Sequence, residues 1–140
     1  MCTRIRGIQM GPGSVATVDQ LGGRSVSIWG FGNGTGQYNA RSERLDTLYK
    51  KYDRGIIQME SFWEGTAEFR DFKNRDFHIA VILNKNNEFV ILTRPANSLV
   101  KPYHLRHPLI IDPMKDNEFL KGKLDSSMYL DESMIILKTT

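Results

Sequence analysis

Two short apolar runs near the middle of the chain constrain its fold most strongly. They are Ile79-Ala80-Val81-Ile82-Leu83 and Phe89-Val90-Ile91-Leu92, and the turn-forming sequence Asn84-Lys85-Asn86-Asn87 lies between them. Each run has the length of a β-strand and is far shorter than the roughly 20 apolar residues that a membrane-spanning helix needs. The pattern therefore predicts a β-hairpin formed by residues 77–83 and 88–93.

The rest of the sequence predicts more strands but few helices. Strands are expected at residues 2–9, 24–31, 55–62, 109–111 and 134–137, with loops at residues 11–23 and 30–36. An amphipathic helix is predicted from Ser42, its N-cap, to Tyr52, where apolar residues recur with helical spacing, and a short helix at residues 116–124. Strands without a β-α-β alternation favour an α+β fold, with a mainly antiparallel, barrel-like sheet in a single domain over residues 1–140.

Length and composition fit one globular domain. The chain has 140 residues, of which 40% are hydrophobic and 25% charged, and this excludes a disordered or fibrous protein. No apolar segment follows the first basic residues, so we expect a cytoplasmic or nucleoid-associated monomer rather than a secreted or membrane protein. The net charge of +3 is compatible with a polyanionic partner, although an ordinary solvated surface is the commoner explanation.

The only cysteine in the sequence directly follows the initiator methionine. Removal of Met1, which is usual before a small second residue, would make Cys2 the N-terminus, with an amine of pKa about 7.7–8.0 and a thiol of pKa about 8.5. Such a 1,2-aminothiol condenses with an aldehyde to an imine and then closes a thiazolidine ring, which an internal cysteine cannot do. The alternative is that Cys2 is an incidental small residue. One cysteine excludes a disulfide framework, and three histidines without ligand-like spacing predict no metal site.

Three other polar residues are candidates for chemistry. Asn39 opens the sequence Asn39-Ala40-Arg41-Ser42-Glu43, where it could also be an ordinary turn residue. Glu64 follows the apolar pair Phe62-Trp63, and burial there would raise its pKa and suit it to proton transfer, although strand-end glutamates are usually exposed. His104 precedes a predicted strand, in a position where most histidines simply face solvent.

Taken in order, these residues resemble the SRAP family, the SOS response-associated peptidase domains that process abasic sites in DNA. The resemblance spans residues 2 to about 120 and rests on ordered blocks: Met1-Cys2-x-Arg4, Trp29-Gly30, Asn39-Ala40-Arg41-Ser42-Glu43, Phe62-Trp63-Glu64, Phe89-x-Ile91-Leu92-Thr93-x-x-Ala96-Asn97 and His104-x-Arg106-x-Pro108. The chain departs from the usual pattern at Thr3, Gln58 and Gly65, and its glycine-rich residues 30–36 stand where the family has a longer segment.

The resemblance implies an enzyme that captures abasic sites in single-stranded DNA without a cofactor. Cys2 would form a thiazolidine crosslink with the ring-opened sugar, and Asn39 would hold its α-amino group. Glu64 would transfer protons during imine formation and ring closure. His104 would contact the sugar or its phosphate and assist ring opening or strand cleavage. A lyase reaction and autolytic removal of Met1 are further activities that the family implies.

The resemblance also implies contacts with the flanking DNA. Arg4, Arg41 and Arg106 would bind phosphates, which requires positive charge but no base recognition. Trp29 would support a base, since stacking on an aromatic ring tolerates any sequence, or else would pack in the core.

Two other classes of function stay open at the level of sequence. One is an N-terminal-nucleophile amidohydrolase, in which Cys2 would attack an amide and its own amine would act as the base. Such enzymes generally have four stacked layers of helices and sheets. The other is a non-catalytic single-strand-binding module that uses Trp29, Trp63 and the arginines.

Overall fold

The computed structural model describes residues 5–6 and 11–138, and these form two β-sheets with little helix. The larger sheet contains β2 (Val15–Gln20), β3 (Gly23–Trp29), β4 (Asn39–Arg41), β5 (Asp53–Met59), β8 (Phe77–Leu83), β9 (Glu88–Pro95), β10 (Arg106–Pro108) and β11 (Ile110–Ile111). The smaller sheet has the order β1 (Ile5–Arg6), β6 (Ser61–Glu64), β7 (Ala67–Asp71) and β12 (Ile135–Leu137). The α+β class and the barrel-like sheet are confirmed.

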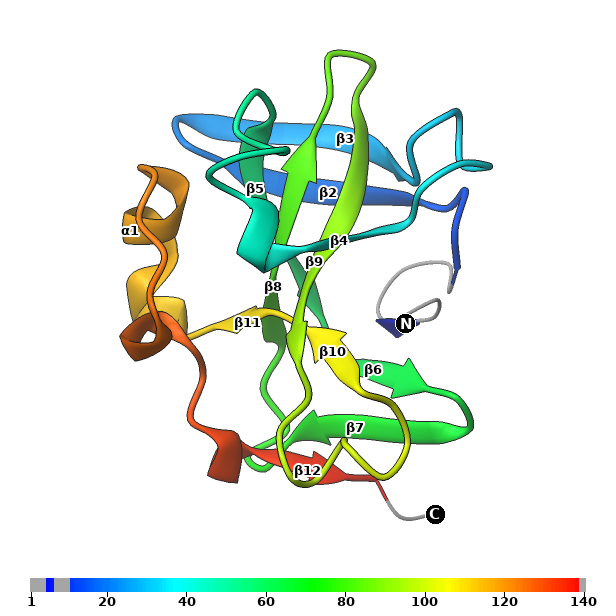
Figure 1. Ribbon diagram of the computed structural model, residues 1–140, viewed down its shortest axis with the longest axis vertical. Helices are drawn as coiled ribbons and strands as arrows, with labels where there is room; N and C mark the ends of the chain where they lie inside the picture. The colour runs from blue at the N-terminus through cyan, green and yellow to red at the C-terminus, as the bar shows by residue number, and fades with distance from the viewer. Residues whose placement is uncertain (1–4, 7–10, 139–140) are drawn as a thin grey trace.

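Part of the larger sheet closes into a ring of strands (Figure 1). Its antiparallel pairs run from β3 to β2, β5, β8 and then β9. The ring closes where β9 pairs in parallel with β3, through Ile28 opposite Glu88 and Trp29 opposite Phe89. β4 and β10 extend the sheet from β9, and β11 pairs with β8. The smaller sheet lies across one end of the barrel (Figure 1).

The central strands are buried on both faces, which explains their uninterrupted apolar runs. On β8, Ile79 and Val81 belong to the core cluster shared with the smaller sheet, whereas Ala80 and Ile82 belong to a second cluster. That second cluster includes fully buried Phe119 of the only described α-helix, α1 (Asp116–Leu120). A strand covered on both faces needs apolar residues at consecutive positions rather than at alternate ones.

The predicted hairpin of residues 77–83 and 88–93 is confirmed as β8 and β9, but the helix predicted from Ser42 to Tyr52 is wrong. Only the short 3₁₀ helix η1 (Ser42–Arg44) forms there, followed by turns, and Arg41 rather than Ser42 is at its N-cap. Leu45 is buried, but 62% of the Leu48 surface is exposed. The apolar residues therefore do not share one face, although their spacing in sequence is helical.

Other boundaries also differ from the prediction. β2 occupies part of the loop predicted at residues 11–23, where Ala16 and Val18 point into the core. The strand predicted at residues 55–62 is divided at Glu60 into β5 and β6, and the helix predicted at residues 116–124 ends at Leu120. The short strands β4 and β7 were not predicted. Within the described residues, no helix is long and apolar enough to cross a bilayer.

Candidate functional site

A pocket of about 360 Å³ lies where β4, β9 and β10 meet. β4 pairs in parallel with the middle of β9, and β10 pairs with the end of β9. The pocket is lined by Asn39, Ala40, Arg41, Tyr49, Thr93, His104, Leu105 and Arg106. It brings together four of the residues selected from the sequence: Asn39, Arg41, His104 and Arg106. The order of the strands explains this, since segments more than 60 residues apart in sequence attach to the same strand.

The Arg106 side chain is held by the protein itself. Its Nη1 and Nη2 atoms donate to the two Glu43 carboxylate oxygens at 2.8 and 2.5 Å, and Nη2 and Nε donate to Thr93 O and Oγ1 at 2.9 and 3.0 Å. The hydrogen bond from Arg106 lowers the pKa of Glu43 to about 2. Only 11% of the Arg106 side chain is exposed. Arg106 therefore joins η1 to β9 and β10, and its expected contact with a DNA phosphate stays a prediction.

His104 is held by the backbone of the same segment. The Arg106 amide lies 3.1 Å from His104 Nδ1. The Arg106 carbonyl oxygen lies 3.2 Å from the same nitrogen, so the backbone of Arg106 holds the imidazole ring at Nδ1. Because the Arg106 side chain is fixed by Glu43, this carboxylate indirectly helps to position the imidazole that the Arg106 backbone holds.

Glu64 is the last residue of β6 and is fully buried. Burial penalises its charged form and raises the pKa of its carboxyl from 4.5 to about 7. The expected burial is thus confirmed, and the pKa shift has the expected direction. Gly65 follows in a left-handed conformation, with φ of 62°, and begins the turn to β7. Glycine at this position suits a turn that other residues rarely adopt.

Two ring contacts connect the strands around Glu64 with the segment that carries His104. Phe62 of β6 stacks on His107 of β10 with ring centroids 5.9 Å apart, and Phe69 of β7 meets Tyr103 edge-on at 5.6 Å. Burial lowers the pKa of His107 to about 4, so this ring is neutral and packs as an aromatic core residue. The two β-sheets therefore meet beside the pocket.

The structure favours the core-packing alternative for Trp29. The side chain is fully buried, its ring stacks on Phe89 with centroids 6.4 Å apart, and its Nε1 donates to Tyr38 O at 3.0 Å. No surface of this ring is open to a nucleobase, so its expected DNA contact is corrected. Arg41, in contrast, is exposed and lines the pocket. Cys2 and Arg4 lie outside the described residues.

Sequence reasoning missed several residues that line this pocket or hold its lining in place. Glu43 and Thr93, which hold Arg106, were quoted only as parts of longer blocks. The signal for Glu43 was its place in the block that contains Asn39 and Arg41. Tyr49 was assigned to a helix, and no sequence pattern distinguished Leu105.

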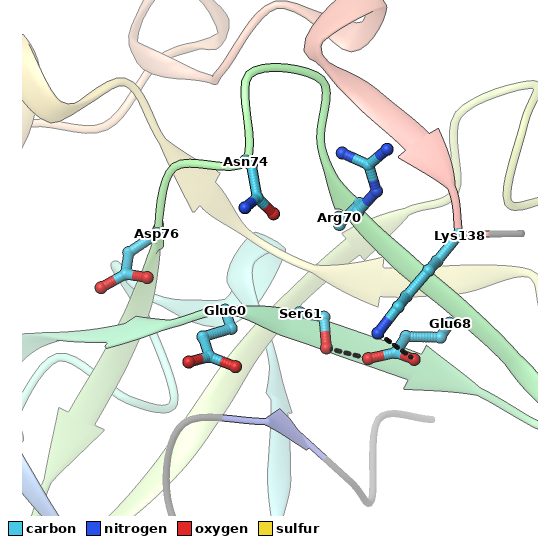
Figure 2. A pocket seen from close by; sticks show the side chains of 7 residues that line it. All are labelled: Glu60, Ser61, Glu68, Arg70, Asn74, Asp76 and Lys138. Carbon is cyan, nitrogen blue, oxygen red and sulfur yellow. Dashed lines mark hydrogen bonds and ion pairs between the residues drawn. The ribbon is translucent and has the colours of Figure 1, made fainter. Parts of the chain in front are cut away.

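A second hollow, of about 330 Å³, lies beside the smaller sheet (Figure 2). Ser61 Oγ donates to Glu68 Oε2 at 2.5 Å, and Lys138 Nζ lies 3.5 Å from Glu68 Oε1, so the buried Glu68 carboxylate is neutralised within the protein. The remaining lining residues are Glu60, Arg70, Asn74 and Asp76. Among the residues that the structure describes, no three His, Cys, Asp or Glu side chains are arranged to hold a metal ion.

The fold also occurs in solved bacterial proteins. The crystal structure of a protein from Bordetella bronchiseptica matches with a TM-score of 0.72 and 16% sequence identity, over 94% of this chain and 87% of that one. A crystal structure from Bacteroides thetaiotaomicron matches with a TM-score of 0.63 and 16% identity, over 87% of this chain and 71% of that one. No family model and no curated protein sequence matches the chain. At these identities the likeness shows the fold alone.

Proposed function

We propose that this protein captures abasic sites in single-stranded DNA through a covalent bond to Cys2, as the resemblance to the SRAP family implies. The pairing of β1 with β6 carries the proposal. Ile5, three residues after Cys2, pairs with Phe62, two residues before Glu64. Three residues span at most about 11 Å, so the sequence position of Cys2 limits its distance from this strand pair. This limit on the distance between Cys2 and the β1–β6 pair supports Glu64 as the proton-transfer partner of Cys2.

The reaction needs an amine, a thiol and a group that both donates and accepts protons. The Cys2 amine adds to the aldehyde of the ring-opened sugar, and loss of one water gives an imine. The thiol sulfur then bonds to the imine carbon while a proton returns to nitrogen, so one aldehyde and one aminothiol yield a thiazolidine and water. A carboxyl of pKa about 7 exists in both protonation states near neutral pH, as this sequence requires.

The pocket residues fit supporting roles in this proposal. Asn39 would hold the Cys2 amine, and His104, which lines the same pocket and is held at Nδ1 by the Arg106 backbone, would contact the sugar or its phosphate. Exposed Arg41 supplies positive charge for the DNA backbone. Arg106 acts as a positioning residue, and its expected phosphate contact stays a prediction.

The competing enzyme class has less support from the fold. A four-layer amidohydrolase places helices on both sides of two stacked sheets, whereas the described part of this chain has a single α-helix of five residues. A non-catalytic single-strand-binding module stays open and predicts DNA binding without a covalent product.

Denaturing electrophoresis tests the proposal. The protein, with Met1 removal verified by mass spectrometry, is incubated with a single-stranded oligonucleotide that has one abasic site. We expect an adduct whose mass is the sum of both components less one water. Cys2→Ala should form no stable adduct, and Glu64→Gln should form it more slowly, whereas Glu60→Gln, at an exposed carboxylate, should match the parent. Absence of an adduct with the parent, or an equally stable adduct with Cys2→Ala, contradicts the proposal.

A further inference from the structure

Two side chains beside the pocket expose apolar surface that the fold does not bury. Tyr103 and Leu105 flank His104, and 46% and 72% of their surfaces are exposed. Leu105 lines the pocket, and the Tyr103 ring contacts Phe69 only edge-on. Large apolar residues that remain exposed together at the edge of a site are typical of a binding surface.

Positive charge lies on the same side of the molecule. Exposed Arg41 lines the same pocket as Leu105, and exposed Lys101 precedes Tyr103 by two residues in the same turn. The half-buried Tyr49 ring adds a further aromatic surface to the lining. Apolar or aromatic side chains next to cations suit a single-stranded nucleic acid, whose bases stack while its phosphates meet the charges.

We propose that Leu105 and Tyr103 receive the unpaired base next to the abasic nucleotide. This inference rests on the proposed function, since a sugar bound at His104 puts the neighbouring base beside the residues that flank His104. An abasic nucleotide leaves a gap in the stack of bases, and an exposed aliphatic side chain can fill such a gap. Trp29 cannot take this role, because its ring is fully buried.

Fluorescence of 2-aminopurine beside the abasic site tests the inference. This base is quenched when it stacks on other bases, so its transfer onto Leu105 and Tyr103 raises its emission. We expect the parent protein to raise the emission and Leu105→Ser to lose most of that rise. Leu105→Ser should also weaken binding of the abasic strand by about tenfold, in the range of one lost base contact. Its salt dependence should equal that of the parent, because Leu105 carries no charge.

Met114→Ser is the matched control. Met114 lies in the short helix η2 (Pro113–Lys115), outside the pocket lining, and is 88% exposed, so its substitution should change neither emission nor affinity. If the parent forms the crosslink but Leu105→Ser equals it in emission and affinity, the inference is wrong and the proposed function stands. If the parent forms no crosslink, both are overturned.

Discussion

The buried Glu64 carboxyl should make the protein less stable as pH rises, and Glu64→Gln should abolish this pH dependence. Its pKa is raised from 4.5 to about 7 in the folded chain. Between these two values the unfolded chain releases the proton while the folded chain keeps it. The unfolded state therefore binds fewer protons, and stability falls as pH rises through this window.

The magnitude follows from the size of the shift. A shift of about 2.5 pH units corresponds to about 3 kcal/mol between pH 4.5 and pH 8.5, because each unit is worth about 1.36 kcal/mol. Glu64→Gln has no ionisable group at this position, so its stability should not show this decrease with rising pH. We therefore expect the variant to gain about 3 kcal/mol relative to the parent on going from the lower to the higher pH, even though its crosslinking is slowed.

Urea denaturation of both proteins at the two pH values measures this double difference, in which the other titrating groups cancel. Glu60→Gln is the control, since Glu60 is exposed and surface substitutions usually change stability by no more than about 0.5 kcal/mol. A double difference below about 0.5 kcal/mol for Glu64→Gln would refute both the raised pKa and the proton-transfer role that depends on it.

Three further perturbations test the fold and the pocket. Gly55→Ala should cost about 1–3 kcal/mol in urea denaturation, because a Cβ atom there would overlap the side chain of Val18 on the neighbouring strand β2. Arg106→Lys should cost about 1–2 kcal/mol by the same assay and slow crosslinking, because lysine cannot make the bidentate contact with Glu43. NMR titration of His78 should give a pKa above 6.5, because its hydrogen bond with Asp116 raises the pKa of the imidazole. The stability that this pair contributes is fully present below pH 6.5 and is lost as pH rises through the pKa of the folded state. This contribution should be absent in Asp116→Asn.

The sequence predicted the parts of the fold in which local pattern and burial agree. The hairpin of β8 and β9 was evident because each strand contains a continuous apolar run, residues 79–83 and 89–92, that is buried on both faces. The helix at Ser42 failed because Leu48 turned out to be exposed, which residue spacing alone does not reveal. β2 was not predicted because its two inward-facing residues, Ala16 and Val18, are small and lie among glycine and polar residues in the sequence.

The candidate site was predictable as a set of residues but not as an arrangement. Burial of Glu64 followed from its apolar neighbours, whereas the ion pair that fixes Arg106 joins η1 to β10, two segments that meet only in the folded chain. Trp29 shows the same limit, since an aromatic residue at the end of a strand can face the core or the solvent. The strand order decides which, and local sequence does not encode it.

The parallel closure of the barrel has a consequence for how the chain folds. The contacts between β3 and β9 join residues that are 60 positions apart, whereas β2 with β3 and β6 with β7 are local hairpins that need little chain ordering. Closing so long a loop is entropically costly, and chains rich in such contacts fold in milliseconds to seconds. We therefore expect the hairpins, including that of β8 and β9, to form early and the closure of β3 on β9 to set the folding time.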